Sequence, residues 1–267
     1  MDILSHTFSG LAIGATALHF SKKKVSYKMF LLFSCGFAAF FPDLDVITQW
    51  SGFDTTFGNW FDLKEKGSLI YHQKRWFSHH ALFHSLPMAI LFTGILSLYF
   101  RLRRRVSWRS VWRENKLFFA AVFSAYLVHL FEDMPTPTFV WGGVAFLFPS
   151  EQYWGGKGYI WWWNNYDLFL IIISIFVLNI SLTGLTLFRI RNVVTQSIAS
   201  IILIIGVGLF NYQMLHRGYS FNYSGMSEHH QVWQMNEAKS LELQKEILGD
   251  ELYEIMIKID HSIPFWF

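Results

Sequence analysis

Residues 168–188 read LFLIIISIFVLNISLTGLTLF, a run without a charged side chain. A helix needs about 20 mostly apolar residues to cross the hydrocarbon core of a bilayer. The run therefore predicts a transmembrane helix, and we interpret the rest of the chain around it as a membrane protein.

The composition also indicates a membrane protein. Hydrophobic residues make up 52% of the 267 residues, charged residues only 15%, and the mean hydropathy is +0.28. Soluble domains usually carry about 25% charged residues. The net charge of +3 is modest, and no block of basic and aromatic residues predicts nucleic-acid binding. The single cysteine, Cys35, excludes a disulfide framework and a cysteine-based zinc site.

Five further apolar segments predict the other helices of a bundle: 7–20, 28–41, 85–100, 117–131 and 196–212. In the first of these, Gly10 and Gly14 would let a neighbouring helix approach closely. The predicted fold is all-α, a polytopic membrane helical bundle of about six membrane helices. Residues 1–212 form the membrane-embedded domain, and residues 213–267 form a tail with an amphipathic helix.

Basic residues predict the orientation of this bundle. Thirteen of the 22 lysines and arginines lie in three short loops, around 22–28, 101–116 and 189–191. An excess of Lys and Arg marks the cytoplasmic side. Both termini and the loops 42–84 and 132–165 are then expected outside. The second of these loops is rich in tryptophan, which favours the bilayer interface.

Histidines and aspartates gather at the outer ends of the predicted helices. His129 and Asp133 are four residues apart, and on a helix such residues share a face. Pro42 precedes Asp43 and Asp45 and disfavours the helical conformation in the residue before it. In an extended segment, residues two apart point the same way, so we expect both carboxylates to face one cation. For each pair, an ordinary polar helix end is the alternative.

A third group contains His79, His80 and His84. His80 and His84 have the i, i+4 spacing of one helical face, whereas His79 is favoured if the chain turns after it, and the sequence leaves this choice open. His6 lies just before the first apolar segment and completes the set. The candidate metal ligands are His6, Asp43, Asp45, His79, His80, His84, His129 and Asp133.

Four short motifs in this order resemble those of a known family. They are MDILSH at residues 1–6, PDLD at 42–45, HHALFHS at 79–85 and HLFED at 129–133. They look like the motifs of the membrane-bound metal-dependent hydrolases, whose bacterial members include an SOS-regulated inner-membrane protein. That family is thought to be distantly similar to the superfamily of zinc-dependent phospholipase C and single-strand nucleases.

The third motif departs from the family pattern, which usually reads His-Arg-Gly-x-Thr-His-Ser. Here His80, Ala81 and Phe83 replace the arginine, glycine and threonine. Arginine binds phosphate through two parallel hydrogen bonds. Without it, contact with a substrate phosphate would fall to Lys74 or Arg75.

The resemblance implies an enzyme, a membrane-bound metal-dependent hydrolase of phosphoesters such as phospholipids or lipid-linked phosphates. Mixed His and Asp ligands suit zinc, with manganese as the alternative, and their number leaves room for two or more ions. Asp43 and Asp45 are the expected catalytic residues, with Asp43 or Glu132 as the candidate general base.

The expected partners are the lipid bilayer and a lipid substrate, without nucleic acid. The expected location is a bacterial inner membrane, with the site on the extracytoplasmic face. The main alternative is a structural or partner-binding membrane protein whose metal site is not catalytic. A metal transporter is less favoured, because its ligands would lie near the bilayer midplane.

Overall fold

The computed structural model describes residues 1–74, 77–136, 143–156, 159–160, 165–185, 192–216, 245, 249–255 and 257–258. Within these ranges the long regular elements are helices, and Val144 and Trp154 form an isolated bridge. The elements are α1 (Ile3–Leu18), α2 (Val25–Phe40), the 3₁₀ helix η1 (Phe41–Gln49), the π-helical turn η2 (Asp54–Gly58), α3 (Gly67–Tyr71), α4 (Leu86–Arg104), α5 (Trp108–Asp133), α6 (Tyr166–Leu185) and α7 (Asn192–Leu215).

Three of the helices begin at capping side chains that the sequence encodes. The side chain of Asp2 accepts a hydrogen bond from the backbone N–H of Ser5 at the start of α1. Ser85 and Ser107 cap α4 and α5 in the same way. Such caps satisfy backbone donors that have no partner within the helix. The cap at Ser85 fixes the point where the histidine-rich segment ends and α4 begins.

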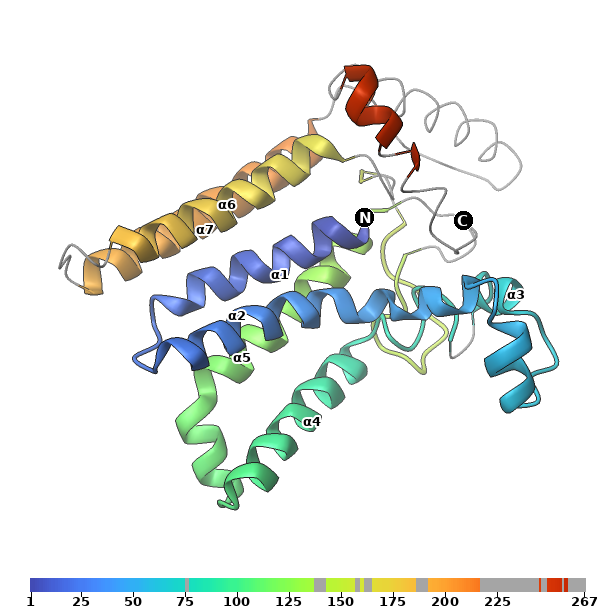
Figure 1. The fold of residues 1–267 in the computed structure, drawn as a ribbon, viewed down its shortest axis with the longest axis horizontal. Coiled ribbons are helices and arrows are strands. Elements are labelled where there is room, and N and C mark those ends of the chain that lie inside the picture. Colours follow the sequence, from blue (N-terminus) through green and yellow to red (C-terminus); the bar gives the residue numbers. More distant parts are fainter. Residues whose placement is uncertain are drawn as a thin grey trace.

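Helix α1 lies at the centre of the bundle (Figure 1). It packs against α2, α5 and α6, and α7 lies beside α6. Helix α4 packs against α5 and diverges from the other helices. The N-terminal end of α1, the junction of α2 with η1, and the C-terminal end of α5 therefore meet at one end of the bundle.

Small residues let α1 and α2 approach closely, as the sequence predicted. A Cβ atom added at Gly10 would lie 2.3 Å from the carbonyl oxygen of Cys35 and 2.6 Å from the Cβ of Ala39. At Gly14, an added Cβ would lie 3.1 Å from the Cβ of Cys35. Alanine and cysteine on the facing side of α2 are fully buried. This contact brings the start of α1 close to the end of α2.

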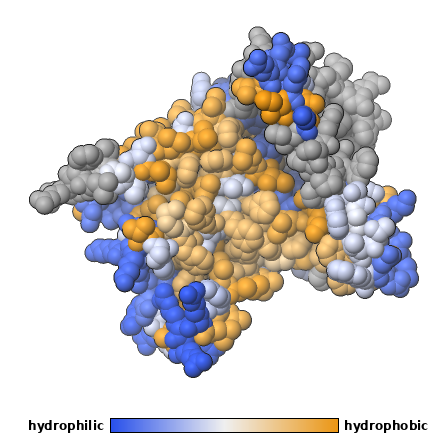
Figure 2. Space-filling view, viewed as in Figure 1, coloured by the Kyte–Doolittle hydropathy of each residue, from blue (hydrophilic) through white to orange (hydrophobic). Residues whose placement is uncertain are grey.

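The six predicted segments all form helices, but only four spans in the described residues are long and apolar enough to cross a membrane. They are Val25–Gln49, Leu86–Arg104, Asp167–Gly184 and Asn192–Leu215. Helix α1 is apolar but shorter, and α5 carries charged residues in its first turns. A bundle of six spans is thus not established, although the exposed surface of the helices is largely apolar (Figure 2).

The segment after Pro42 is a 3₁₀ helix, so the predicted extended conformation is wrong. Phe41 keeps helical dihedral angles, with φ −57° and ψ −39°, because α2 runs directly into η1. Proline is compatible with the first turn of a helix, where its missing N–H would have no partner. With three residues per turn, side chains two apart differ by about 240° in direction. Asp43 and Asp45 therefore do not point the same way.

Two expected features fall partly outside the described residues. In the tryptophan-rich loop, Trp154 is described and 44% exposed, whereas Trp141 and Trp161–Trp163 lie outside the described ranges. In the tail, residues 249–255 are helical, and residues 217–244 are outside those ranges.

Replacing Gly10 by alanine should lower the free energy of unfolding by about 1–3 kcal/mol, since the new methyl group overlaps with α2. The matched control is Gly94→Ala in α4, where an added Cβ meets nothing within 4 Å. Thermal unfolding in detergent, followed by circular dichroism, measures both. Equal melting temperatures for the two variants would contradict the close packing of α1 on α2.

The orientation can be tested by labelling single cysteines with a membrane-impermeant maleimide. Lys23 precedes α2 in the sequence and Asp62 follows it, and both side chains are exposed. We expect Asp62→Cys to react in intact cells, and Lys23→Cys only after permeabilisation, because basic loops stay in the cytoplasm. The unmodified protein, whose only cysteine is buried, gives the background. Reaction of both variants from the same side would disprove the topology.

Candidate metal centre

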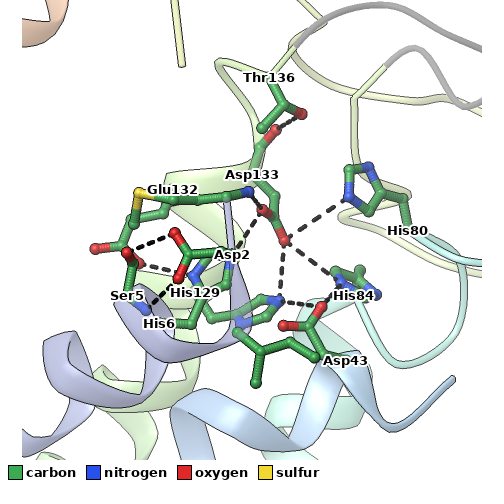
Figure 3. A network of polar contacts seen from close by, with 12 residues as sticks. Asp2, Ser5, His6, Asp43, His80, His84, His129, Glu132, Asp133 and Thr136 are labelled. Carbon is green, nitrogen blue, oxygen red and sulfur yellow. Dashed lines mark hydrogen bonds and ion pairs between the residues drawn. The ribbon is translucent and has the colours of Figure 1, made fainter. Parts of the chain in front are cut away.

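Four buried side chains from three segments converge where α1, η1 and α5 meet (Figure 3). His129 and Asp133 come from the last turns of α5, Asp43 from the first turn of η1, and His84 from the segment before α4. Each is at most 5% exposed. We call these four residues, Asp43, His84, His129 and Asp133, the four-ligand group.

The distances within the four-ligand group are compatible with binding of one ion. Asp133 Oδ2 lies 2.9 Å from His129 Nε2 and 3.4 Å from His84 Nε2. Asp43 Oδ1 lies 3.6 Å from His84 Nε2 and 3.7 Å from His129 Nε2. Ligands about 2.0–2.1 Å from a tetrahedral zinc ion are about 3.3 Å apart. The arrangement can therefore accept an ion with small adjustments.

Several of these atoms also lack hydrogen bonds. The Nε2 atoms of His84 and His129 and the Oδ2 atom of Asp133 are buried and make none, although they lie close together. Buried polar atoms in folded proteins nearly always have a partner. Nitrogen and oxygen atoms that are close but not aligned for hydrogen bonding fit a common cation. The donor set, two imidazoles and two carboxylates, suits zinc or another divalent transition metal.

Outer contacts orient the two imidazole rings. The Nδ1–H of His129 donates to the carbonyl oxygen of Ala39 at 2.6 Å, which directs Nε2 toward the four-ligand group. His84 Nδ1 lies 3.2 Å from Asp45 Oδ2, and Asp45 Oδ1 lies 2.9 Å from His79 Nδ1. Metal-binding histidines typically have such a carbonyl or carboxylate on their second nitrogen. The structure thus places Asp45 behind the histidines and outside the four-ligand group.

A second candidate group consists of His79, His80 and His84, and it shares His84 with the first. His80 Nδ1 donates to the carbonyl oxygen of Gly143 at 2.8 Å, and His80 Nε2 lies 3.8 Å from Asp133 Oδ2. The segment is a series of turns, with φ 62° at His80, so helical spacing does not apply. Both histidines that the sequence left as alternatives approach the site. The side chain of His79 is 14% exposed, whereas that of His80 is buried.

His6 lies behind Asp133. Its Nε2 atom is 3.1 Å from Asp133 Oδ1, the oxygen that faces away from the four-ligand group, and its Nδ1 atom is 2.8 Å from Glu132 Oε2. The hydroxyl of Ser9 donates to the other oxygen of Glu132. The amino group of Met1 also donates to Asp133 Oδ1, at 2.8 Å. His6 therefore supports Asp133 in this arrangement, although the sequence presented it as a ligand.

Sequence reasoning missed three of these contacts. Nothing in the pattern singled out Ser9, the Met1 amino group or the carbonyl oxygen of Ala39. The spacing of Ser9 three residues after His6 was the one usable signal, because such residues lie on the same helical face. Lys74, suggested for phosphate contact, instead lies over the ring of Tyr153 at 4.6 Å, and Arg75 is outside the described residues.

Two buried histidines of the segment before α4, His80 and His84, have strongly shifted pKa values. Burial and the neighbouring His79 lower the pKa of His80 well below its usual range, which leaves a neutral ring that can bind a metal. Burial also disfavours the charged form of His84, but the carboxylates of Asp45, Asp133 and Asp43 outweigh it and raise the pKa of this ring well above its usual range. The carboxylates thus favour a positive charge here, which a metal ion would supply in place of a proton.

Gently purified protein should contain a bound divalent metal, measurable by mass spectrometry of the elements. Asp133→Asn and His129→Ala should each lower the metal affinity by at least about tenfold, because each removes a ligand atom or its charge. His216→Ala is the control, since that histidine is exposed and lies outside both groups. A metal content that is equally low in all three variants and the unmodified protein would contradict the metal centre.

Comparison with protein families gives a match over most of the chain. Residues 1–215 match the family described as YdjM inner membrane protein, a range that contains α1 to α7 and both candidate groups. Comparison with curated proteins and with solved structures gave no match. The family description supports the membrane part of the earlier resemblance, and neither its hydrolase part nor its phospholipase C part. Because the match covers most of the sequence, the chain belongs to the YdjM inner membrane protein family.

Proposed function

We propose that this protein is a membrane-bound metal-dependent hydrolase that cleaves a phosphoester of a lipid or a lipid-linked phosphate. The observation that carries the proposal is the four-ligand group together with the adjoining His79, His80 and His84. One ion needs about four ligands, so the site offers more than a single structural ion requires. The surplus favours two ions, or one ion with positions for water and substrate.

A divalent ion held here would lower the pKa of a water molecule and accept negative charge from phosphoryl oxygens. The side chains of the protein would orient the reacting groups and transfer protons. Asp45 fixes the rings of His79 and His84, and His6 fixes Asp133. Preorganised ligands of this kind hold reacting groups in place without reorganisation during the reaction.

Asp43 is the better candidate for the general base. Its Oδ1 atom belongs to the four-ligand group, while its Oδ2 atom is buried and makes no hydrogen bond. Both oxygens of Glu132, the other candidate, are taken by His6 and Ser9. In the proposed reaction, Asp43 Oδ2 accepts the proton of the attacking water. Asp45 assists as the carboxylate that orients the histidines.

The surroundings of the site suit an amphiphilic substrate. Phe77, two residues before His79, is 55% exposed, and Trp154 is 44% exposed. Exposed aromatic side chains favour the boundary between headgroups and acyl chains. His79 is the partly exposed member of the site, so a phosphate headgroup would approach from its side. We therefore propose a lipid substrate in the outer leaflet of a bacterial inner membrane.

A structural metal site is the second candidate function. The four-ligand group is complete and buried, as in structural zinc sites, which hold four ligands and no open position. In this case the ion would tie η1, α5 and the segment before α4 together, and no turnover would depend on it.

The two candidates differ in what the metal and the mutations change. Metal-loaded protein in lipid nanodiscs is screened against phospholipids, lipid phosphates and soluble phosphoesters. For the hydrolase, Asp43→Asn should lower kcat by about 100-fold or more, the usual contribution of a general base. His216→Ala should leave turnover unchanged, because this histidine is exposed and belongs to neither candidate group.

The melting temperature is measured on the same samples. Turnover that disappears with chelation and returns with zinc or manganese would support the hydrolase. Metal that raises only the melting temperature, without turnover of any substrate class, would favour the structural site and refute the hydrolase.

A further inference from the structure

The connection between α4 and α5 is the most basic surface of the described chain. Residues 101–116, which we call the α4–α5 hairpin, contain seven lysines and arginines, and all seven are exposed. The only acidic residue among them is Glu114, which lies 3.4 Å from Arg104. Figure 2 shows this tip as a hydrophilic patch below the apolar surface of the helices. Most of its positive charge has no acidic partner within the hairpin.

A kink in α5 sets the direction of this patch. Asn115 has non-helical dihedral angles, with φ −125° and ψ 18°, inside an otherwise continuous helix. Its side-chain amide donates to the carbonyl oxygen of Val111, and its Oδ1 accepts from the hydroxyl of Tyr27 at 3.0 Å. The hydrogen bond from Tyr27 anchors this kink of α5 to α2. The first turns of α5 consequently run away from the bundle beside the end of α4 (Figure 1).

Aromatic and apolar side chains are interleaved with the cations, which makes the hairpin a basic and aromatic block that the composition did not single out. Trp108 is 41% exposed and Trp112 is 45% exposed. The guanidinium of Arg101 lies 4.8 Å from the ring centre of Trp108. Leu102, between two arginines, is 66% exposed. Tryptophan beside arginine, on a surface continuous with lipid-facing helices, is typical of the region where headgroups meet acyl chains.

We propose that the α4–α5 hairpin binds the headgroups of anionic phospholipids in the membrane leaflet beside it. The negative phosphates complement the unpaired cations, and electrostatic attraction to an anionic leaflet grows with each Lys or Arg at its surface. Trp108, Trp112 and Leu102 contact the upper acyl chains. Nucleic acid would match the charge but not these exposed apolar side chains. The hairpin lies outside the metal centre, so this inference does not depend on the proposed hydrolysis.

The test uses the purified full-length protein in nanodiscs with equal parts of phosphatidylglycerol and phosphatidylcholine, followed by native mass spectrometry of the retained lipid. The unmodified protein should retain phosphatidylglycerol in preference to phosphatidylcholine. It should retain less phosphatidylglycerol at high salt, because salt screens exposed charges. In the variant R103Q/R104Q/R105Q this preference should fall at least about tenfold, because three surface cations are removed. Retention of phosphatidylcholine should not change.

Two further variants serve as controls. K22Q/K23Q/K24Q removes the same charge from the exposed turn between α1 and α2, and should lower the preference less than the hairpin variant does, because no tryptophan accompanies these lysines. R103K/R104K/R105K keeps the charge and should retain the preference, which separates lost binding from lost folding.

Three results would overturn the inference. They are unchanged phosphatidylglycerol retention in the glutamine variant of the hairpin, an equal loss in the α1–α2 variant, and binding of RNA by an unmodified protein that does not distinguish the two lipids.

Discussion

Two carboxylates, Asp43 and Asp133, are buried together at the end of an apolar bundle, and the structure depends on how their charge is balanced. An isolated buried carboxylate is costly, and two close together repel each other as well. Cationic or neutral nitrogen atoms lie close to both carboxylates. Asp133 Oδ1 receives the Met1 amino group and His6, while its Oδ2 faces His129 and His84. The contacts on Oδ1 hold Asp133 in place. A divalent ion near Oδ2 would bind the unpaired atoms that converge there.

This balance requires the backbone to be positioned closely, and the packing of the bundle provides it. The absence of a side chain at Gly10 lets α1 approach α2, and His6 lies one turn away on the same helix. The hydrogen bond from His129 to the carbonyl oxygen of Ala39 joins α5 to the last turn of α2. The hydroxyl of Tyr126 donates to the carbonyl oxygen of Phe83 and joins α5 to the histidine segment. Each ligand-bearing segment is thus fixed by backbone contacts as well as through the ligands, as precise metal sites require.

The sequence predicted the features that depend on periodicity and failed where they depend on turns. Apolar runs located all six helices, and the i, i+4 spacing of His129 and Asp133 placed both side chains in one group. The rule for residues before proline failed at Pro42, since α2 continues into η1 and carries Phe41 along. The choice between His79 and His80 could not be made from spacing, because the segment has no regular period. His6 supports Asp133 through a tertiary contact. The position of a single histidine before an apolar run does not predict such a contact.

The composition of α5 is one of two reasons why the apolar spans are fewer than the helices of the bundle, and the shortness of α1 is the other. This helix carries cations in its first turns and the acidic Glu132 and Asp133 in its last, so it does not resemble a lipid-facing span. Its apolar face, which includes Phe118, Val122 and Tyr126, is buried against α1, α2 and α4. A helix shielded by its neighbours does not need an apolar surface on every side, because protein contacts replace lipid. Polar chemistry can therefore be concentrated on α5, with cations at one end and the candidate metal ligands at the other, while the surrounding helices meet the bilayer.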